Sequence, residues 1–488
     1  MKKSSGRNKF GIKAWLISAA LTALANQANA QSADSLIETL VDKGILTVGE
    51  AQELRDQADN DFKTTFQSKT GMPDWVTGYK VSGDFRGRFD QVTSENNLNN
   101  DRARLRYRLR FGVAVNMLDN MEAGFRLGSA DAKGVGSQSA AGNPLSSNST
   151  MQDNFTKKNI YIDTAYGKWT VVGAGDWQLA VTVGKMENPF NFTPMVFDPD
   201  LTPEGGAITG GYTINDHHAI VFTGAAFAMD EESSTTHDPF MYGGQILWNA
   251  KWTPKLASTL GVGAFQIVSA QQLTAGGNVP GINQGNTRQY LTSLTDTNHV
   301  TKSIYTQTSY PVNHFTPLIA DASVTYTLDS FPFYAGTFPV KFAGEYINNT
   351  STTKNNNGFW VGVTLGKSGT KRTWDIAYRY EYLEADAWYD QIVDDDNGAY
   401  YGTTIYPGNP RGTANASMSK GWMAGTNIKG HLIKLNYSFT DSFTFSAACY
   451  LNDLINLPQQ VPAVSSKTKP VDLTSGAMHF MADLMWKF

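Results

Sequence analysis

Five arginines that alternate with apolar residues form the most distinctive chemical pattern of the sequence. Between residues 102 and 116 the odd positions are apolar or aromatic, and the basic residues at even positions are Arg102, Arg104, Arg106, Arg108 and Arg110. A helix would scatter these side chains around its surface, whereas a strand places all five on one face. Neighbouring segments extend the row with Arg86, Arg88 and Arg126. Such a surface of guanidinium groups can attract and orient anions.

An acidic segment at 187–204 is the second feature that could do chemistry. Its acidic residues are Glu187, Asp198, Asp200 and Glu204. Four prolines restrict its backbone, and three phenylalanines could pack it inward. Folded opposite the arginine row, this segment would create a transverse field that sorts ions by charge. An ordinary outer loop is the alternative. The segment contains no lysine, which argues against a site selective for phosphate.

Other reactive residues do not combine into a catalytic or metal-binding motif. His431 and His479 have no accompanying nucleophile motif, so we predict that the chain is not an enzyme. The acidic triplet at 394–396 lacks the spacing of a calcium loop, and we expect it to be solvated in an outer loop. Cys449 is the only cysteine, which excludes an internal disulfide. The sequence therefore predicts no metal and no cofactor.

The arginine row belongs to one of sixteen segments that we predict to be strands, because period-two alternation recurs from residue 75 onward. These segments lie at 79–89, 102–116, 120–131, 158–169, 177–186, 205–214, 217–229, 240–252, 256–268, 318–328, 338–348, 357–367, 374–382, 426–439, 443–453 and 475–488. Several are weakly patterned, so fourteen or eighteen strands are open alternatives.

The links between these strands alternate in length. Short links fall at 118–120, 215–216, 253–254, 368–371 and 441–442, and long polar links lie at 91–101, 132–157, 187–204, 230–239, 269–317, 386–425 and 454–474. This asymmetry is typical of a transmembrane barrel with tight periplasmic turns and long outer loops. A bilayer tolerates no unpaired backbone group, so the sheet must close on itself. We therefore predict an all-β, antiparallel transmembrane β-barrel at 75–488.

A barrel of this size determines where the arginines point. Sixteen strands enclose an open aqueous lumen, and an arginine facing lipid at the midplane would cost about 2–4 kcal/mol. We therefore expect the arginine row to line the lumen. Pairing with acidic residues on neighbouring strands is a second role, compatible with the first. Tryptophans near strand ends suit the aromatic girdles of a barrel, and they are Trp75, Trp169, Trp177, Trp248, Trp252 and Trp486.

The two ends of the chain carry processing signals. A basic start, a short apolar core and Ala28-Asn29-Ala30 predict a signal peptide at 1–30 and a mature chain from Gln31. Residues 31–74 read as a periplasmic segment of two short helices and a linker, either an oligomerisation or peptidoglycan-facing element or a plain spacer. Without the signal the chain has 35 basic and 44 acidic residues, a net charge of −9 that disfavours nucleic-acid binding.

Several short stretches resemble the putative porin family of Gram-negative outer membranes. They are GDFR at 83–86, MEAGFRL at 121–127, FTKKNIYID at 155–163 and GKMENPF at 184–190. KGILT at 43–47 resembles the same family and also the phosphate-selective porins. The alternating C-terminal strand, with Trp486 and the terminal Phe488, resembles the signal read by the barrel assembly machinery. The resemblance implies an outer-membrane barrel with a pore, and it supplies no catalytic residue.

These features together predict a diffusion pore for small hydrophilic solutes and ions, with a weak preference for anions. A substrate-specific channel, for example for phosphate, and a structural or adhesive barrel without an open pore are the alternatives. The expected partners are outer-membrane lipid, lipopolysaccharide and the barrel assembly machinery, and family analogy adds a homotrimer.

Overall fold

The computed structural model describes residues 73–95, 101–131, 142–231, 236–273, 284–297, 300–311, 313–401, 421–456 and 475–488. The chain divides into two compact units, Met1–Thr77 and Gly78–Phe488. The predicted signal peptide and nearly all of the predicted helical segment and linker lie outside the described residues. Within the described part, no helix has the length and apolar character needed to cross a membrane.

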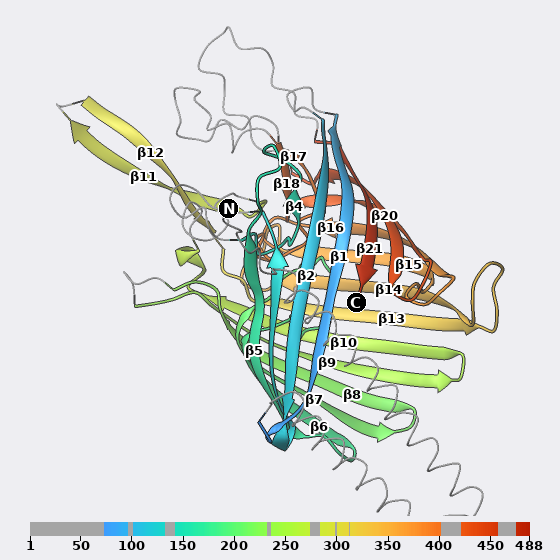
Figure 1. Ribbon diagram of the computed structural model, residues 1–488. Coiled ribbons are helices and arrows are strands. Elements are labelled where there is room, and N and C mark those ends of the chain that lie inside the picture. The colour runs from blue at the N-terminus through green and yellow to red at the C-terminus, as the bar shows by residue number, and fades with distance from the viewer. Residues whose placement is uncertain are drawn as a thin grey trace, which may run out of the picture. The chain divides into compact units, whose positions relative to one another are not determined.

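Sixteen long antiparallel strands form one sheet, and its first strand pairs with its last (Figure 1). They are β1 (Val76–Ser94), β2 (Arg102–Met117), β3 (Met121–Ser129), β5 (Ile160–Val172), β6 (Trp177–Lys185), β7 (Glu204–Asn215), β8 (His218–Ala228), β9 (Phe240–Thr253), β10 (Leu256–Val268), β13 (Pro317–Leu328), β14 (Phe338–Asn349), β15 (Asn357–Gly366), β16 (Thr373–Leu383), β19 (Ile428–Ser438), β20 (Phe443–Leu454) and β21 (Ala477–Lys487). The predicted closed barrel of sixteen strands is confirmed, including the weakly patterned strand at 205–214.

Smaller elements lie in the long links. The short strand β4 (Ser149–Thr150) pairs with β2. Two separate hairpins are formed by β11 (Arg288–Thr297) with β12 (Val300–Pro311) and by β17 (Gly398–Tyr401) with β18 (Gly421–Ala424). Single 3-10 turns occupy Leu118–Asn120 and Ala270–Gln272. The links predicted at 269–317 and 386–425 are therefore not purely irregular.

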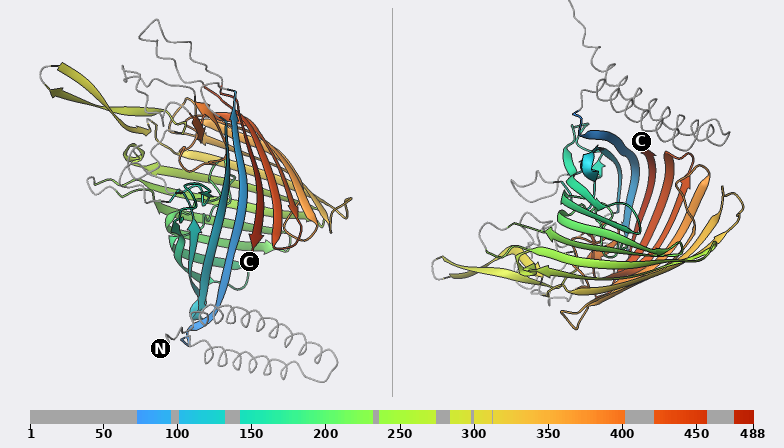
Figure 2. Two further views of the ribbon diagram at one scale, coloured as in Figure 1. Left: turned by 45° about the horizontal axis from the view of Figure 1, so that its top comes forward. Right: turned by 90° about the horizontal axis from the view of Figure 1, so that it is seen from below.

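The barrel closes where the N-terminal and C-terminal strands meet. Asp84 to Ser94 of β1 pair with Lys487 to Ala477 of β21, and Figure 2 shows the two strands side by side. The backbone N–H groups of Gly83 and Phe488 each donate to the other residue's carbonyl oxygen, at 2.8 and 3.1 Å. The ring of Phe488 lies over Gly83, where a Cβ would come within 2.6 Å of it. The terminal residue thus completes the sheet.

The alternation in the sequence separates an apolar outer face from a charged inner face. On β2, Leu105, Leu109 and Phe111 are exposed on the outside, whereas Arg106 and Arg108 are buried on the inside. The tight link to β3 places Asp119 and Asn120 at positive φ (60° and 57°), a conformation that short polar residues adopt more readily than others. Of the six tryptophans expected in girdles, Trp248 is half-buried, and the exposed ones are Trp75, Trp169, Trp177, Trp252 and Trp486.

Two links fold into the barrel rather than away from it. Residues 186–203 and 384–400 form one apolar cluster with the inner faces of several strands, and Trp388 donates its indole N–H to the Val196 carbonyl at 2.9 Å. The first link contacts Phe265 of β10 on one side and, through Asp200, Arg108 of β2 on another. Because these strands lie on different sides of the barrel, the two links occupy the lumen.

The prediction of a solvated acidic triplet at 394–396 is wrong. Asp394 is only 6% exposed, and its backbone N–H donates to the Pro194 carbonyl of the other inward link at 3.0 Å. The physical reason is the apolar run just before the triplet, in which Trp388, Ile392 and Val393 are buried in the lumen cluster. Burying this run draws the acidic residues after it into the barrel, where basic side chains pair with them.

Candidate functional site

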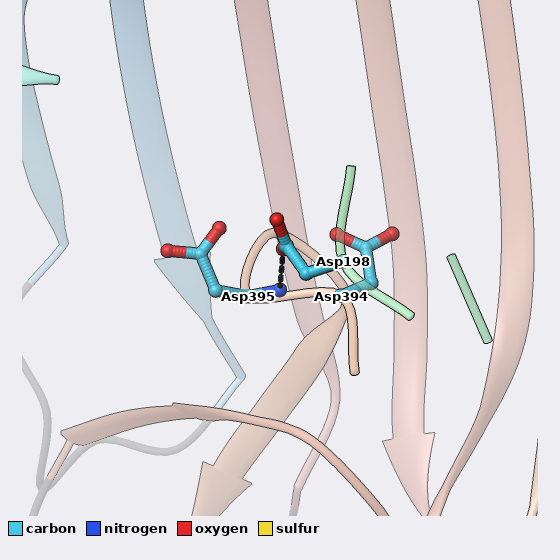
Figure 3. A group of neighbouring side chains, drawn as sticks. All are labelled: Asp198, Asp394 and Asp395. Carbon is cyan, nitrogen blue, oxygen red and sulfur yellow. Dashed lines mark hydrogen bonds between the residues drawn. The ribbon is translucent and has the colours of Figure 1, made fainter. Parts of the chain in front are cut away.

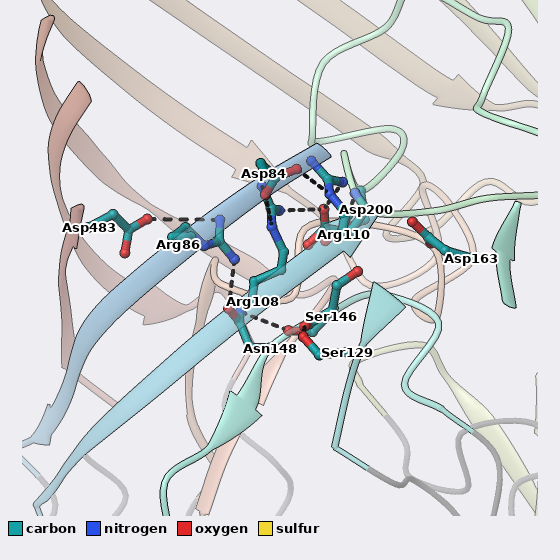
Figure 4. A network of polar contacts seen from close by, with 12 residues as sticks. Asp84, Arg86, Arg108, Arg110, Ser129, Ser146, Asn148, Asp163, Asp200 and Asp483 are labelled. Carbon is teal, nitrogen blue, oxygen red and sulfur yellow. Dashed lines mark hydrogen bonds and ion pairs between the residues drawn. The ribbon is translucent and has the colours of Figure 1, made fainter. Parts of the chain in front are cut away.

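The arginines of β2 are held between acidic residues of the wall and of the first inward link (Figure 4). Arg108 and Arg110 donate to Asp84 of β1 with their Nε atoms, at 2.9 and 2.7 Å. The same two guanidinium groups donate to Asp200 with Nη1, at 3.0 and 3.4 Å. Asp200 therefore brings the link against the arginine row, and four charged groups from three segments meet at one point.

A second cluster lies farther along β1 and β2. Asp90 is fully buried and accepts hydrogen bonds from Arg104 at 2.9 Å and Arg106 at 3.3 Å. Its other carboxylate oxygen, Oδ1, lies 3.3 Å from Nε2 of His479 on β21. An uncompensated carboxylate at this position would be costly, so the arginines and the histidine are part of what allows Asp90 to be buried.

The seam between β1 and β21 carries a third cluster. Arg88 forms a two-pronged pair with Asp483, with N–O distances of 2.8 and 2.9 Å, and a further ion pair with Asp396 of the second inward link at 3.1 Å. Arg86 donates to Asn148 at 2.7 Å and lies 3.8 Å from Asp483 (Figure 4). Two-pronged pairing suits the planar guanidinium group, which a lysine would not replace.

The two remaining arginines differ. Arg126 of β3 donates to Asp163 of β5 at 2.5 Å and also pairs with Glu187 at the start of the first inward link. Arg102, at the start of β2, is exposed, and no carboxylate among the described residues forms an ion pair with it. Of the eight arginines singled out in the sequence, seven thus contact acidic partners. The sequence does not reveal this pairing, because the partners come from segments far apart along the chain.

The four acidic residues expected in the first link take different positions. Asp198 is buried against the second inward link, and Asp200 contacts Arg108 and Arg110 on the inner face of β2. Glu187 lies at the root of the link, and its side chain is 70% exposed. Glu204 is the first residue of β7 rather than part of the link, and it pairs with Lys185 of β6 at 3.0 Å. The link therefore presents two of its four acids to the interior.

Where the two inward links meet, three carboxylates lie together (Figure 3). Oxygen atoms of Asp198, Asp394 and Asp395 lie within 4.8 Å of one another, and the Asp395 backbone N–H donates to Asp198 at 3.1 Å. Burial and the charges of Asp395, Asp200 and Asp394 raise the pKa of Asp198 well above its ordinary value. Burial and the charge of Asp396 also raise the pKa of Asp394, although Arg379 opposes this. Both groups are thus shifted toward the neutral form.

Two cavities adjoin this meeting point. One of about 540 Å³ is lined by arginines of β1 and β2, by Arg379 of β16 and by Lys341 and Lys434 of β14 and β19. Another of about 720 Å³ lies against β3, β5, β8 and β9. Asp200 lines both cavities, so it lies at the boundary between them.

The second inward link is the functional element that sequence reasoning missed. Trp388 and Tyr389 in a long link predicted to be polar were the available signal, since such residues are seldom left in water. On β16, Arg379 contacts Asp394 of this link at 3.7 Å, and Glu381 accepts from Asn397 at 2.8 Å. The two predicted assembly residues, Trp486 and Phe488, lie on the outer face of the seam.

Comparisons with known proteins identify relatives of this chain. A family model described as putative porin matches residues 91–422. No curated protein sequence matches the chain. A high-pH structure of OprB from Pseudomonas putida is 12% identical with a TM-score of 0.46, covering 87% of this chain and 96% of that chain. A mutant porin of Rh. blastica is 8% identical with a TM-score of 0.39, covering 84% and 100% of the two chains. OmpF of Salmonella typhi in complex with daunomycin is 8% identical with a TM-score of 0.41, covering 84% and 97%.

Proposed function

The chain belongs to the putative porin family, and from this premise we propose that it forms a water-filled channel through which small hydrophilic solutes and ions diffuse across the outer membrane of a Gram-negative bacterium. One observation above all supports an aqueous interior. The inner face of the sheet carries arginines, lysines and carboxylates, and the outer face carries exposed apolar residues. Charged groups in this number belong next to water rather than lipid.

We assign the narrow part of the channel to the section of the arginine row around Arg108 and Arg110 and to the first inward link. The pore-lining residues proposed are Arg86, Arg88, Arg102, Arg104, Arg106, Arg108, Arg110 and Arg126. Asp198 and Asp200 form the opposing side, and Glu187 and Glu204 lie at the ends of the link. The contact of Asp200 with Arg108 and Arg110 supports this assignment, because it places acidic and basic groups at the boundary of two cavities.

A weak preference for anions is the selectivity we propose. The 540 Å³ cavity is lined by equal numbers of basic and acidic residues. The raised pKa values of Asp198 and Asp394 favour the neutral forms of these two acids and so shift the charge balance of the cavity toward its basic residues. In addition, Lys341 and Lys434 have no ion-pair partner among the described residues. The excess of positive charge is small, since most arginines are neutralised by the acids they contact.

A barrel closed by its own links is the second candidate function. The shared apolar cluster of residues 186–203 and 384–400 fills part of the lumen, and a structural barrel would use it as a plug. A channel specific for one anion is a third possibility, for which the two unpaired lysines would be the natural ligands.

Export and assembly complete the proposal. The sequence pattern supports cleavage after Ala30 and insertion by the barrel assembly machinery through the strand that ends at Phe488. The family supports contact with lipopolysaccharide and assembly into a homotrimer.

Swelling of liposomes that contain the purified protein tests solute diffusion. We expect neutral sugars to enter at rates that fall steeply with sugar size, as for a pore narrowed by two links. Equal entry into protein-free liposomes, or no swelling with a correctly folded barrel, would contradict the proposed function. Saturation of the rate by a single anion would instead favour a specific channel.

A further inference from the structure

The second inward link is fixed to the barrel wall at several points. Asp394 contacts Arg379 of β16 and accepts a hydrogen bond from the Tyr450 hydroxyl of β20 at 3.3 Å. Asn397 accepts from Asn452 of β20 at 2.8 Å. Between them, Asp396 pairs with Arg88 of β1. These contacts hold residues 394–397 against the part of the barrel wall that runs from β16 through β20 to β1.

His479 of β21 lies at the centre of this attachment. Its ring is buried, with only 2% of the side chain exposed. Nδ1 lies 2.8 Å from the backbone carbonyl oxygen of Asp396, and Nε2 lies 3.3 Å from Oδ1 of Asp90. A carbonyl oxygen can only accept, so Nδ1 has to carry a proton for its contact with Asp396. A second proton, on Nε2, gives the ring the positive charge that turns its approach to the Asp90 carboxylate into an ion pair. A neutral ring would direct a lone pair at one of these two oxygens.

The groups around His479 come from each element packed against it. From β1 it faces Asp90 and Arg88, and Arg104 and Arg106 of β2 reach Asp90 from the other side. From the link it faces Asp396. Burial raises the pKa of this carboxyl group, but the positive charges of Arg88, His479 and Arg86 together outweigh burial, so its pKa lies below the ordinary value. From β20 the ring of Tyr450 stacks on it at 6.0 Å. The two carboxylates adjacent to the ring favour its cationic form, and the nearby arginines are themselves paired with acids.

We propose that protonated His479 is a positioning residue that clamps the second inward link to the wall, and that the link is released from this clamp as pH rises. The inference rests on the proposed channel function, because the link would then narrow the conducting path. Histidine is suited to the task, since its charge changes in the range between weakly acidic and weakly alkaline conditions. Alkaline conditions should therefore loosen the link and make the pore current unsteady.

Single-channel recording across a pH series from about 6 to about 9 tests the clamp. The wild type should pass steady current at the acidic end and show several-fold more frequent transitions between current levels at the alkaline end. His479→Gln, which cannot donate to both partners, should show frequent transitions at every pH. His479→Lys, which keeps a positive charge, should stay steady over the range. His431→Gln is the matched control, because His431 is exposed on β19 and bonds to Tyr378, away from the link.

Hydrogen exchange provides a readout that does not need conduction. At about pH 6, amides of residues 384–400 should exchange faster in His479→Gln than in the wild type, His479→Lys or His431→Gln. A pH-independent wild type, or a His479→Gln variant that keeps the wild-type pH profile and exchange, would overturn the clamp. If either His479→Gln or His479→Lys fails to fold, the other variant and the wild-type pH series still test the clamp. A barrel that conducts at no pH but shows the exchange difference would reject the channel and leave the clamp standing.

Discussion

At the scale of single residues, the arginines of the row are more buried, and their positive charges more fully paired with acidic residues, than the sequence alone implies. Arg108 is 6% exposed and shares its guanidinium group between Asp84 and Asp200. Such a group contributes to ion selectivity mainly through the net charge that it and the acidic residues around it carry together. Removing one member changes the local charge by one unit in a narrow, weakly screened part of the path.

Replacing Arg108 with glutamine should shift the reversal potential in a salt gradient toward cation selectivity, because Asp84 and Asp200 lose a shared positive partner. The shift should be large at 0.1 M salt, where charges are screened over about 10 Å, and small at 1 M, where the distance is about 3 Å. Adding Asp200→Asn should reverse most of it. Arg102→Gln, on the same strand but exposed at its outer end, is the control. Equal shifts for Arg102→Gln and Arg108→Gln would contradict the assigned constriction.

Asp198 predicts a dependence of stability on pH. Its raised pKa means that the folded state favours the protonated form, so this residue costs stability increasingly as pH rises from the ordinary carboxyl range toward the raised value. Asp198→Asn should therefore match the wild type in acid and unfold at higher denaturant concentration than the wild type at neutral and alkaline pH. Urea titrations in detergent at several pH values measure this. Asp163→Asn, which removes a partner of Arg126, should instead destabilise. A stabilising effect of Asp198→Asn only in acid would refute the argument.

At the scale of elements, the strands were predictable and the inward link at 384–400 was not. Period-two alternation is a local property, and the bilayer enforces it along β2 and β21 on every residue that faces lipid. The position of a link depends on what its side chains meet across the barrel. Trp388 packs against Phe265 and Phe315, which lie far from it along the chain. For the same reason the charged face of β2 could be predicted, whereas its partners Asp90 and Asp200 could not be assigned to particular arginines.

The packing of the two inward links makes Trp388 the residue on which their positions depend most. It is fully buried between Val196, Phe197 and the wall. Truncating a buried tryptophan costs on the order of 3–5 kcal/mol. We expect Trp388→Ala to leave the barrel intact by circular dichroism while amides of 186–203 and 384–400 exchange faster. Phe333→Ala, at a residue 97% exposed in the link between β13 and β14, is the control. Unchanged exchange in Trp388→Ala would show that the links are held by other contacts.

The terminal strand carries a prediction about assembly. Deleting Phe488 removes two backbone hydrogen bonds to Gly83 and the ring that lies over it. The yield of heat-modifiable barrel in outer membranes should fall far more than it does for Phe155→Ala, which changes an exposed residue of an outer link. Undiminished yield of the truncated protein would count decisively against an assembly role for the C-terminal residue.

At the scale of the whole molecule, the protein is a closed sheet whose outer face suits lipid and whose inner face suits water. The two links narrow the interior without changing the sheet, so the wall and the constriction are separable parts. The wall follows from the demands of a bilayer on any chain. The constriction depends on the individual pairs among Arg88, Arg108, Asp200 and Asp396.

Conductance of single molecules in a planar bilayer tests directly whether the barrel encloses an open pore. We expect discrete, reproducible steps of current when purified wild-type protein inserts, with an open state that persists at low voltage and a weak anion preference in dilute salt. Insertion of heat-modifiable, folded barrel without any steps of current would contradict it, because the two inward links would then close the lumen rather than narrow it.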